Sequence, residues 1–264
     1  MIALKKYINY LLTFKKFYYL FTILVKRNIK KKYKGSALGI LWSLLNPLLN
    51  MIVLTIVFST LFRRSIENFP VYLLSGRLIF GFFSSSTSTS LRSIINSAPL
   101  LKKVYIPKYI MTLADITANF ITFMISMLDL IIVILITRAE ITLNIIYAPI
   151  ILILLFVFVC GVSLILSTIT VFFRDISYLY QVSLTMLVYA SAVFYPKEII
   201  PPKYQFILTF NPVFHYIEGF RQSVYYGLPP EIDNLIICTL IAFVSIVVGI
   251  VVFEKNQDKF MLHI

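Results

Sequence analysis

Apolar residues gather in long runs along this chain, and short polar segments separate the runs. Six runs reach the roughly 20 mostly apolar residues that a helix needs to cross the hydrocarbon core of a bilayer. They cover residues 38–62, 71–91, 109–137, 145–173, 176–195 and 235–253. The pattern therefore predicts an all-α integral membrane protein, with six transmembrane helices in a single domain that takes up residues 1–264.

Residues 1–35 follow a different pattern, in which basic and apolar positions recur at helical spacing. Most Lys and Arg side chains after residue 14 fall on one side of a helix, whereas Lys32 falls on the apolar side, so we expect the helix to end near it. Such an amphipathic helix lies in the membrane interface. One interpretation is that its charges only orient the protein in the membrane. The other is that they also bind a phosphorylated lipid or a partner protein. The candidates for headgroup binding are Arg27, Lys30, Lys31 and Lys34.

The composition indicates that lipid, rather than water, solvates much of the chain. Hydrophobic residues make up 59% of the 264 residues, and the mean hydropathy is +0.90, whereas soluble domains contain about 45–50% apolar residues. The net charge of +13 would suit nucleic acid, but basic nucleic-acid domains are polar overall, so we expect no nucleic acid partner. Cys160 and Cys238 lie in apolar runs without metal-ligand spacing, which predicts two small buried side chains and no metal site.

The distribution of Lys and Arg predicts which side of the membrane each connection occupies. The first 35 residues contain ten of them and no acid, and residues 92–108 contain four and no acid. On the opposite side, Arg63 and Arg64 are accompanied by Glu67. Because cytoplasmic loops are enriched in basic residues, we expect both basic segments, and both termini, in the cytoplasm.

Four stretches together resemble the permeases of ABC-2 type transporters, and more narrowly those that export O-antigen, capsule or teichoic acid chains. They occur in order over nearly the whole chain, at residues 30–48 (KKKYKGSALGILWSLLNPL), 100–108 (LLKKVYIPK), 172–176 (FFRDI) and 211–221 (NPVFHYIEGFR). The resemblance implies a homodimer of the permease with two separate ABC ATPase subunits. No P-loop pattern occurs in the sequence, so ATP and Mg²⁺ are expected on the partner, and no cofactor on this chain.

The connection between the second and third spans contains a candidate contact with that ATPase. Pro99 suits the first turn of a short helix, and Pro107 ends the segment. The resemblance implies a coupling helix seated in a groove of the ATPase, whereas a loop held at the interface by its lysines is the alternative. Arg174 and Asp175 either brace this region or form a local ion pair at a tight turn. The coupling candidates are Leu100, Leu101, Lys102, Lys103, Val104, Tyr105, Arg174 and Asp175.

The loop from residue 196 to residue 234 is rich in Pro and interleaves aromatic with polar residues. The resemblance implies two short re-entrant helices here, near residues 202–209 and 212–226, which form an external gate. His215, Glu218 and Arg221 follow at intervals of three, so neighbours in this series can touch and form ion pairs. A hydrolytic site is not expected here, because no nucleophile or paired carboxylate accompanies this series. The gate candidates are Pro202, Asn211, Pro212, His215, Glu218 and Arg221.

Polar residues within the spans are candidates for a channel lining. Hydroxyl residues fill positions 84–90 and cover every face of that helix, so some must meet neighbouring helices, and helix packing alone is one explanation. Asp115, Asn119 and Asp129 follow one stripe of the third span; as proton relays they would indicate a secondary transporter instead. Aromatic rings suit sugar faces, and the candidates near the first span are Tyr33, Trp42 and Phe58.

These features predict the transmembrane subunit of an exporter in the bacterial cytoplasmic membrane, with no catalytic residues of its own. The cargo implied by the resemblance is a polysaccharide linked to a lipid of the undecaprenyl-pyrophosphate type. One alternative is an ABC-2 exporter of a small hydrophobic compound. A membrane-embedded enzyme of glycolipid assembly is another, but the chain has no Asp-x-Asp pair and only two histidines, His215 and His263. A scaffold without transport activity fits the polar spans poorly.

Overall fold

The computed structural model describes residues 2–62 and 66–264, with side chains from residue 15 to 58 and from 66 to 264; Arg63 and Arg64 lie outside the described residues. Within this part of the chain the regular structure is entirely helical, as predicted. The long helices are α1 (Ile2–Lys32), α2 (Trp42–Phe62), α3 (Phe69–Leu91), α6 (Tyr109–Thr137), α7 (Ala148–Phe172), α8 (Ile176–Ala190), α10 (Pro212–Val224) and α11 (Ile232–Asn256).

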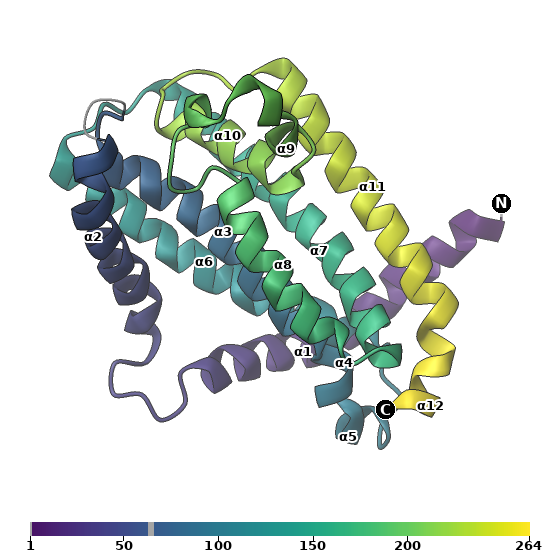
Figure 1. Cartoon of the computed structure of the whole chain (residues 1–264). Helices are drawn as coiled ribbons and strands as arrows, with labels where there is room; N and C mark the ends of the chain where they lie inside the picture. Colours follow the sequence, from purple (N-terminus) through teal and green to yellow (C-terminus); the bar gives the residue numbers. More distant parts are fainter. Residues whose placement is uncertain (1, 63–65) are drawn as a thin grey trace.

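Short helical segments lie in the connections between the long helices. The 3₁₀ segments are η1 (Gly39–Leu41), η2 (Leu143–Tyr147), η3 (Lys197–Ile199), η4 (Pro202–Tyr204) and η5 (Gln257–Lys259), and the short α-helices are α4 (Ser93–Asn96), α5 (Ala98–Leu101), α9 (Phe206–Thr209) and α12 (Phe260–His263). Figure 1 shows α9 and α10 at one end of the bundle, and α5 and α12 at the other. We call these the α10 end and the α5 end. Helix α1 runs across the bundle toward the α5 end (Figure 1).

Among the described residues, four helical stretches are long and apolar enough to cross a membrane: Gly39–Phe58, Tyr109–Thr137, Leu143–Phe172 and Ile232–His263. The other two predicted spans fall short for different reasons. Helix α3 has 23 residues but carries Arg77 and seven consecutive hydroxyl residues. Helix α8 has 15 residues and ends at Ala190, because Ala192 adopts a left-handed backbone with φ of 50°. The continuous helix predicted to residue 195 is therefore wrong at its end.

Helices α7 and α11 pack together through glycine. A Cβ atom added to Gly161 would overlap the backbone of Ser245, and one added to Gly249 would lie 2.5 Å from the carbonyl oxygen of Gly161. Glycine has no Cβ atom, so it lets two helix backbones approach closely. Cys238 and Ala242 complete the buried face of α11, which confirms the burial predicted for both cysteines.

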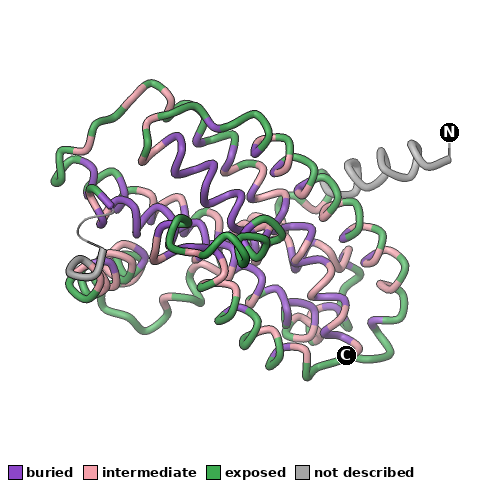
Figure 2. The backbone as a smooth tube through the Cα atoms, turned by 45° about the horizontal axis from the view of Figure 1, so that its top comes forward, coloured by how far each residue is buried: buried purple, intermediate pink, exposed green. Residues whose placement is uncertain are grey.

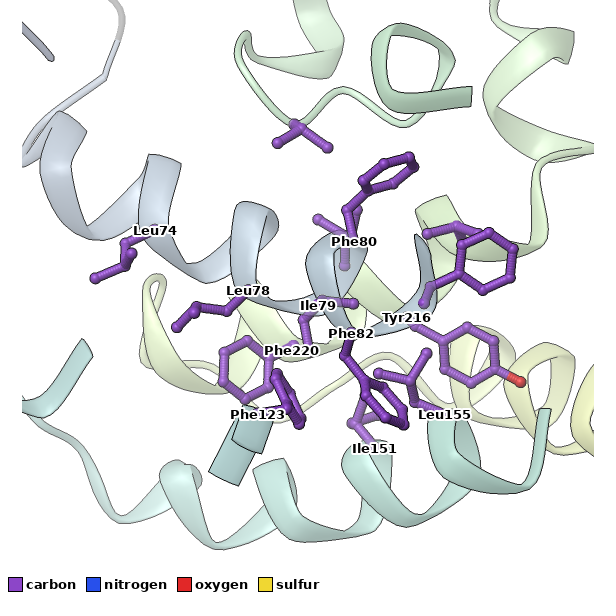
Figure 3. Packing of buried hydrophobic residues seen from close by; sticks show 14 of the residues in the cluster. Leu74, Leu78, Ile79, Phe80, Phe82, Phe123, Ile151, Leu155, Tyr216 and Phe220 are labelled. Atoms are coloured by element: carbon purple, nitrogen blue, oxygen red, sulfur yellow. The ribbon is translucent and has the colours of Figure 1, made fainter. Parts of the chain in front are cut away.

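Two large apolar clusters hold the bundle together, and a third, of Ala192, Leu208 and Phe214, lies at the α10 end. The larger cluster joins α3, α6, α7 and α10, with Phe82 stacked on Phe123 and the Ile151 and Leu155 side chains beside them (Figure 3). The smaller cluster lies at the α5 end and contains Leu24, Val25, Ile94, Leu101, Ile106, Ile110, Met111, Ala114, Ala118, Leu164, Val171, Phe253 and Phe260. In Figure 2 the buried residues follow the central helices, whereas the outer helices are largely exposed. The smaller cluster therefore fixes α1, α5 and α12 to the ends of the long helices.

Candidate functional site

A cavity of about 890 Å³ lies between α2, α3, α6 and α8, next to the end of α1. Each of the four helices turns polar residues toward it; on α2, α6 and α8 they recur at intervals of three or four positions, which places them on one helical face. These residues are Asn46 and Asn50 of α2, Arg77, Ser84, Ser85 and Ser88 of α3, Asn119, Thr122 and Ser126 of α6, and Gln181, Thr185 and Tyr189 of α8. Four polar stripes thus converge on one space inside an otherwise apolar bundle.

The hydroxyl residues of α3 divide between the cavity and the packed interior. Ser86, Thr87 and Ser90 are fully buried, whereas Ser84, Ser85 and Ser88 line the cavity. This confirms that the run faces in all directions, and shows that helix packing explains only part of it. Ser84 and Ser85 donate to carbonyl oxygens three residues earlier, at 3.2 and 3.3 Å. Their protons are therefore engaged within α3, and their oxygen lone pairs face the cavity.

The cavity lining is cationic. Lys32, Lys34 and Arg77 contribute to it, and no Asp or Glu does so among the described residues. The Lys32 ammonium donates to Asn119 Oδ1 at 3.5 Å, and its partial removal from water lowers its pKa below the ordinary value. Lys32 was not among the sequence candidates because it falls on the apolar side of α1. That side of the helix end packs on α6, where Asn119 supplies a polar partner.

The structure places two of the three predicted channel aromatics on the cavity wall. Tyr33 and Trp42 line the cavity directly. Phe58 does not line it, but its ring stacks on that of Phe194, with centroids 6.3 Å apart, and Phe194 is part of the lining. Tyr189 was missed, since only its spacing from Gln181 on α8 could have indicated it.

Only one of the four predicted headgroup cations reaches the cavity. Lys34 lines it, whereas Arg27, Lys30 and Lys31 do not. Arg27 donates to Asn28 Oδ1 at 3.3 Å, and Asn28 in turn donates to Asp115 Oδ1 at 2.7 Å. The polar residues of the α6 stripe therefore serve partly as contacts for α1.

The segment predicted to couple to an ATPase is helical only in α5, and a turn follows Leu101. Leu101 and Ile106 are buried in the smaller cluster, whereas Tyr105 is 92% exposed. Leu101, one of the coupling candidates, therefore points inward and not to the exposed surface. The helix cannot continue because Ile106 must also turn inward, and because a residue before proline disfavours helical backbone. The exposed candidates are Lys102, Lys103, Val104 and Tyr105, and Leu100 is half-buried.

Arg174 contacts the C-terminal segment. Its guanidinium donates to the carbonyl oxygen of His263 at 3.4 Å, and no ion pair with Asp175 occurs within the described ranges. The tight turn is closed by backbone instead, since the Ser177 amide donates to the Arg174 carbonyl at 3.3 Å. The alternative of a local ion pair is therefore wrong among the described residues, and the role of Arg174 in bracing the coupling segment stays a prediction. Lys108 also donates to the C-terminal segment, at the Gln257 carbonyl, over 2.6 Å.

Asn211 joins the start of α10 to the end of α8. Its Oδ1 accepts from the Val213 amide at 3.0 Å, which caps the helix. Its Nδ2 donates to the Ser191 hydroxyl at 2.8 Å. Pro212 occupies the first helical position, where a missing amide proton costs nothing. Pro202 begins η4 on the exposed surface.

The charged residues of α10 find partners on other segments. Glu218 accepts from Lys197 of η3 at 2.6 Å, rather than pairing with His215 or Arg221. His215 lies between α9 and α11, with Nε2 2.9 Å from the Thr209 carbonyl oxygen and Nδ1 2.9 Å from Asn234 Oδ1. The predicted contacts within the helix are therefore replaced by contacts that fasten α10 to its neighbours.

Arg221 is the most deeply placed of these groups, with 1% of its surface exposed. Its guanidinium donates to the Tyr72 hydroxyl and the Ala192 carbonyl at 2.8 Å, and to the Val193 carbonyl at 2.9 Å. It also lies 3.6 Å from the centre of the Tyr72 ring. Gly76 makes room for it, because an added Cβ atom would overlap the guanidinium. Arg221 thus holds α3, α10 and the chain after α8 together.

Comparison with known proteins places these features in a family. The sequence model described as ABC-2 type transporter matches residues 19–225. An O-antigen export system permease protein RfbA of Klebsiella pneumoniae is 30% identical over 247 residues, which cover 92% of this chain and 95% of the relative. The polysialic acid transport protein KpsM of Escherichia coli is 25% identical over 241 residues, covering 89% and 92% of the two chains.

Proposed function

The chain belongs to the ABC-2 type transporter family, and on this basis we propose that it exports a lipid-linked polysaccharide across the bacterial cytoplasmic membrane. The observation that carries the proposal is the cavity, where four polar helical stripes and aromatic side chains enclose about 890 Å³. Hydroxyl and amide groups suit the hydroxyls of sugars, and rings such as Trp42 suit their C–H faces. The names of the relatives, which concern O-antigen and polysialic acid, point to the same class of cargo.

The proposed topology has six spans, formed by α2, α3, α6, α7, α8 with the residues up to 195, and α11. Helix α6 has 29 residues and is about 43 Å long, whereas the hydrocarbon core is about 30 Å thick. Its first turns can therefore extend into the interface. Helix α1 contacts these turns at Asp115 and Asn119, which supports an interface position for α1. The basic segments place the α5 end and both termini in the cytoplasm.

The proposed assembly is a homodimer with two ABC ATPase subunits. Helices α2 and α8 bury few residues: Ser43 and Met51 among the described residues of α2, and Ser177 and Leu184 of α8. Lipid tails cannot satisfy the polar groups of a neighbouring cavity, so a second copy on this side would complete the wall. Lys102, Lys103, Val104 and Tyr105 form an exposed surface at the cytoplasmic end for the ATPase, with Arg174 and Asp175 on the same end. ATP and Mg²⁺ would be bound by that subunit.

In this scheme the carrier lipid arrives along α1. Arg27, Lys30 and Lys31 would attract its diphosphate, and Lys34 and Lys32 would lead it to the cavity. Helices α9 and α10 would form the gate at the outer end. The hydrogen bonds of Asn211 and Arg221, and the Glu218–Lys197 ion pair, support a gate that moves as one unit rather than as separate loops.

Complementation of a deletion strain tests the proposal. Deletion should leave finished lipid-linked polymer on the cytoplasmic face, and the wild-type gene should restore surface polymer. Tyr105→Asp should restore less than about a tenth of it, because the charge replaces the exposed ring that would be buried against the ATPase and would have to be desolvated there. Leu143→Asp is the control, since Leu143 is 92% exposed in η2, beyond the end of α6 that lies away from α5. The measurement is surface polymer against membrane-bound polymer by immunoblotting.

Two results would contradict the proposal. Normal surface polymer in the deletion strain would exclude polysaccharide export and favour the export of a small hydrophobic compound. Full restoration by Tyr105→Asp, with equal amounts of protein in the membrane, would exclude this surface as the ATPase contact.

A further inference from the structure

Arg77 is a cation inside the cavity without a counter-charge. It lies eight residues into α3, about 12 Å from the helix start at Phe69. Its side chain lines the cavity and is half-buried. Among the described residues it has no hydrogen bond and no ion pair. An ionised side chain at membrane depth is costly to place unless it has a partner or a water-filled cavity.

The described surroundings of Arg77 offer no anion to neutralise its charge. No carboxylate lines the cavity in the described part of the chain. Arg221 lies next to Gly76, one residue before Arg77, and its own hydrogen bonds go to neutral oxygens. Glu218, an acid whose charge acts on Arg221, is already paired with Lys197 at 2.6 Å. The described lining of the cavity therefore supplies no anion to neutralise Arg77.

The cavity has cations at both ends. Lys32 contacts Asn119, and Asn119 contacts Thr89 of α3, at 3.5 and 3.4 Å. Thr89 is twelve residues from Arg77 on the same helix, which corresponds to about 18 Å. Between these levels the wall consists of neutral hydroxyl, amide, aromatic and aliphatic groups. An anion that leaves the lysines thus meets its next cation at Arg77.

We propose that Arg77 is a second binding site for an oxyanion of the cargo, in the outer half of the cavity. The proposal rests on the function proposed above and adds a step to it. A guanidinium group presents a planar fork of donors that binds phosphate or carboxylate in a bidentate way. The oxyanion comes either from the diphosphate of the carrier lipid or from acidic sugars in the polymer. Both present the same chemistry to Arg77, and the experiment below separates them.

The single tryptophan of the chain supplies a direct readout. Trp42 lines the cavity, so its fluorescence reports on occupancy without a label. The purified full chain in lipid nanodiscs is titrated with inorganic pyrophosphate, with trigalacturonate as an acidic sugar chain, and with maltotriose as a neutral one. Isothermal titration calorimetry of the same samples detects binding that does not change the fluorescence. The variants are Arg77→Gln, Arg77→Lys and Arg138→Gln, the last being an exposed arginine outside the cavity.

We expect Arg77→Gln to weaken the binding of at least one anion about tenfold or more, which corresponds to the loss of charge-assisted hydrogen bonds. Arg77→Lys should retain part of the affinity, and Arg138→Gln all of it. Loss confined to pyrophosphate identifies the carrier lipid as the source, and loss confined to trigalacturonate identifies acidic sugars. Maltotriose binding should be equal in all four proteins.

Three outcomes overturn the proposal. They are equal anion binding by wild type and Arg77→Gln, a wild type that binds neither anion, and an equal loss of maltotriose binding, which would show a general change in cavity shape. Equal melting temperatures of Arg77→Gln and Arg138→Gln establish that both fold. Because binding is measured without transport, a failure here leaves the result of the deletion strain intact. Equally, normal export in that strain leaves oxyanion binding at Arg77 intact.

Discussion

The two sides of the bundle are built in opposite ways. On one side α7 and α11 touch through Gly161 and Gly249, where not even a methyl group fits. On the other side α2 and α8 lie around a cavity. Only 11% of the residues in the membrane-crossing part of the Gly39–Phe58 stretch are buried. A Cβ atom added to Gly81, which lines that cavity, would meet nothing within 4 Å. Glycine therefore allows close helix contact on one side of the bundle and borders open space on the other.

This difference assigns separate tasks to the two sides. Tight backbone contact leaves α7 and α11 little freedom to move relative to each other, because close-packed interiors transmit displacement instead of absorbing it. Helices around a cavity can shift without breaking a packed core. We expect the α7–α11 side to act as the fixed frame, and the α2–α8 side to change shape around the cargo. The following predictions test the frame and the open side in turn.

The largest effect is expected at Arg221, which joins the gate helix α10 to α3 and to the chain after α8. Arg221→Met keeps an unbranched chain but leaves the Ala192 and Val193 carbonyls without their donor. Loss of a buried charged donor costs about 4 kcal/mol of unfolding free energy. Thermal unfolding in detergent micelles measures it. Arg92→Met is the control, since exposed Arg92 makes one 3.2 Å hydrogen bond to Ser177; equal losses in the two variants would contradict the role given to Arg221.

The next effect contrasts two glycines. Gly161→Ala should cost about 3 kcal/mol, because the new methyl group forces two helix backbones apart. Gly81→Ala should cost nothing and can gain up to about 1 kcal/mol, since alanine favours helix and the space beside it is open. Equilibrium unfolding in mixed micelles compares the two variants. Comparable stability of both would show that the α7–α11 contact is no tighter than the cavity wall.

The smallest effect concerns the Lys197–Glu218 pair on the gate. Burial opposes the charge of Lys197, but the hydrogen bond and the charge of Glu218 outweigh it and raise its pKa. A raised pKa means that the pair stabilises the fold below about pH 10.4, the unfolded value, and that this contribution disappears as the pH rises through the folded pKa. Because the Lys197 side chain is 44% exposed, the contribution is under about 1 kcal/mol.

Lys197→Met tests this pH dependence. Its melting temperature should lie below that of the wild type at pH 8, and the gap should close above pH 11. Lys203→Met, a change of the same kind in exposed η4, should show no such trend. A gap that stays constant over this range would mean that Met at this position disturbs packing rather than charge.

Much of the architecture follows from patterns of short range. The apolar runs predict the long helices, and α7 matches its run to within a few residues. Tyr33 and Trp42 were found because they flank the entry to α2, beside the basic segment. In these cases the chemistry of a residue and its immediate neighbours determine where it lies.

Other features depend on contacts between distant segments, which a single sequence does not contain. Lys32 appeared misplaced on the helical wheel because its partner Asn119 lies 87 positions away. Leu101 was assigned to a docking surface, although the smaller cluster pulls it inward. The partners of Arg221 lie on α3 and after α8, where a backbone turn at Ala192 exposes carbonyls that no spacing rule could predict.

Ser84 and Ser85 donate their protons to their own helix, and this has a bearing on how fast a polymer can pass. A sugar hydroxyl that moves along α3 meets two neighbouring acceptors of similar geometry there. Between the lysines and Arg77 a neutral sugar meets no charged group of the described lining that would hold it at one position, so the energy profile along this stretch is shallow and friction is low. The rate of passage is then determined by whatever pushes the chain, and repeats of different length can slide over the same surface.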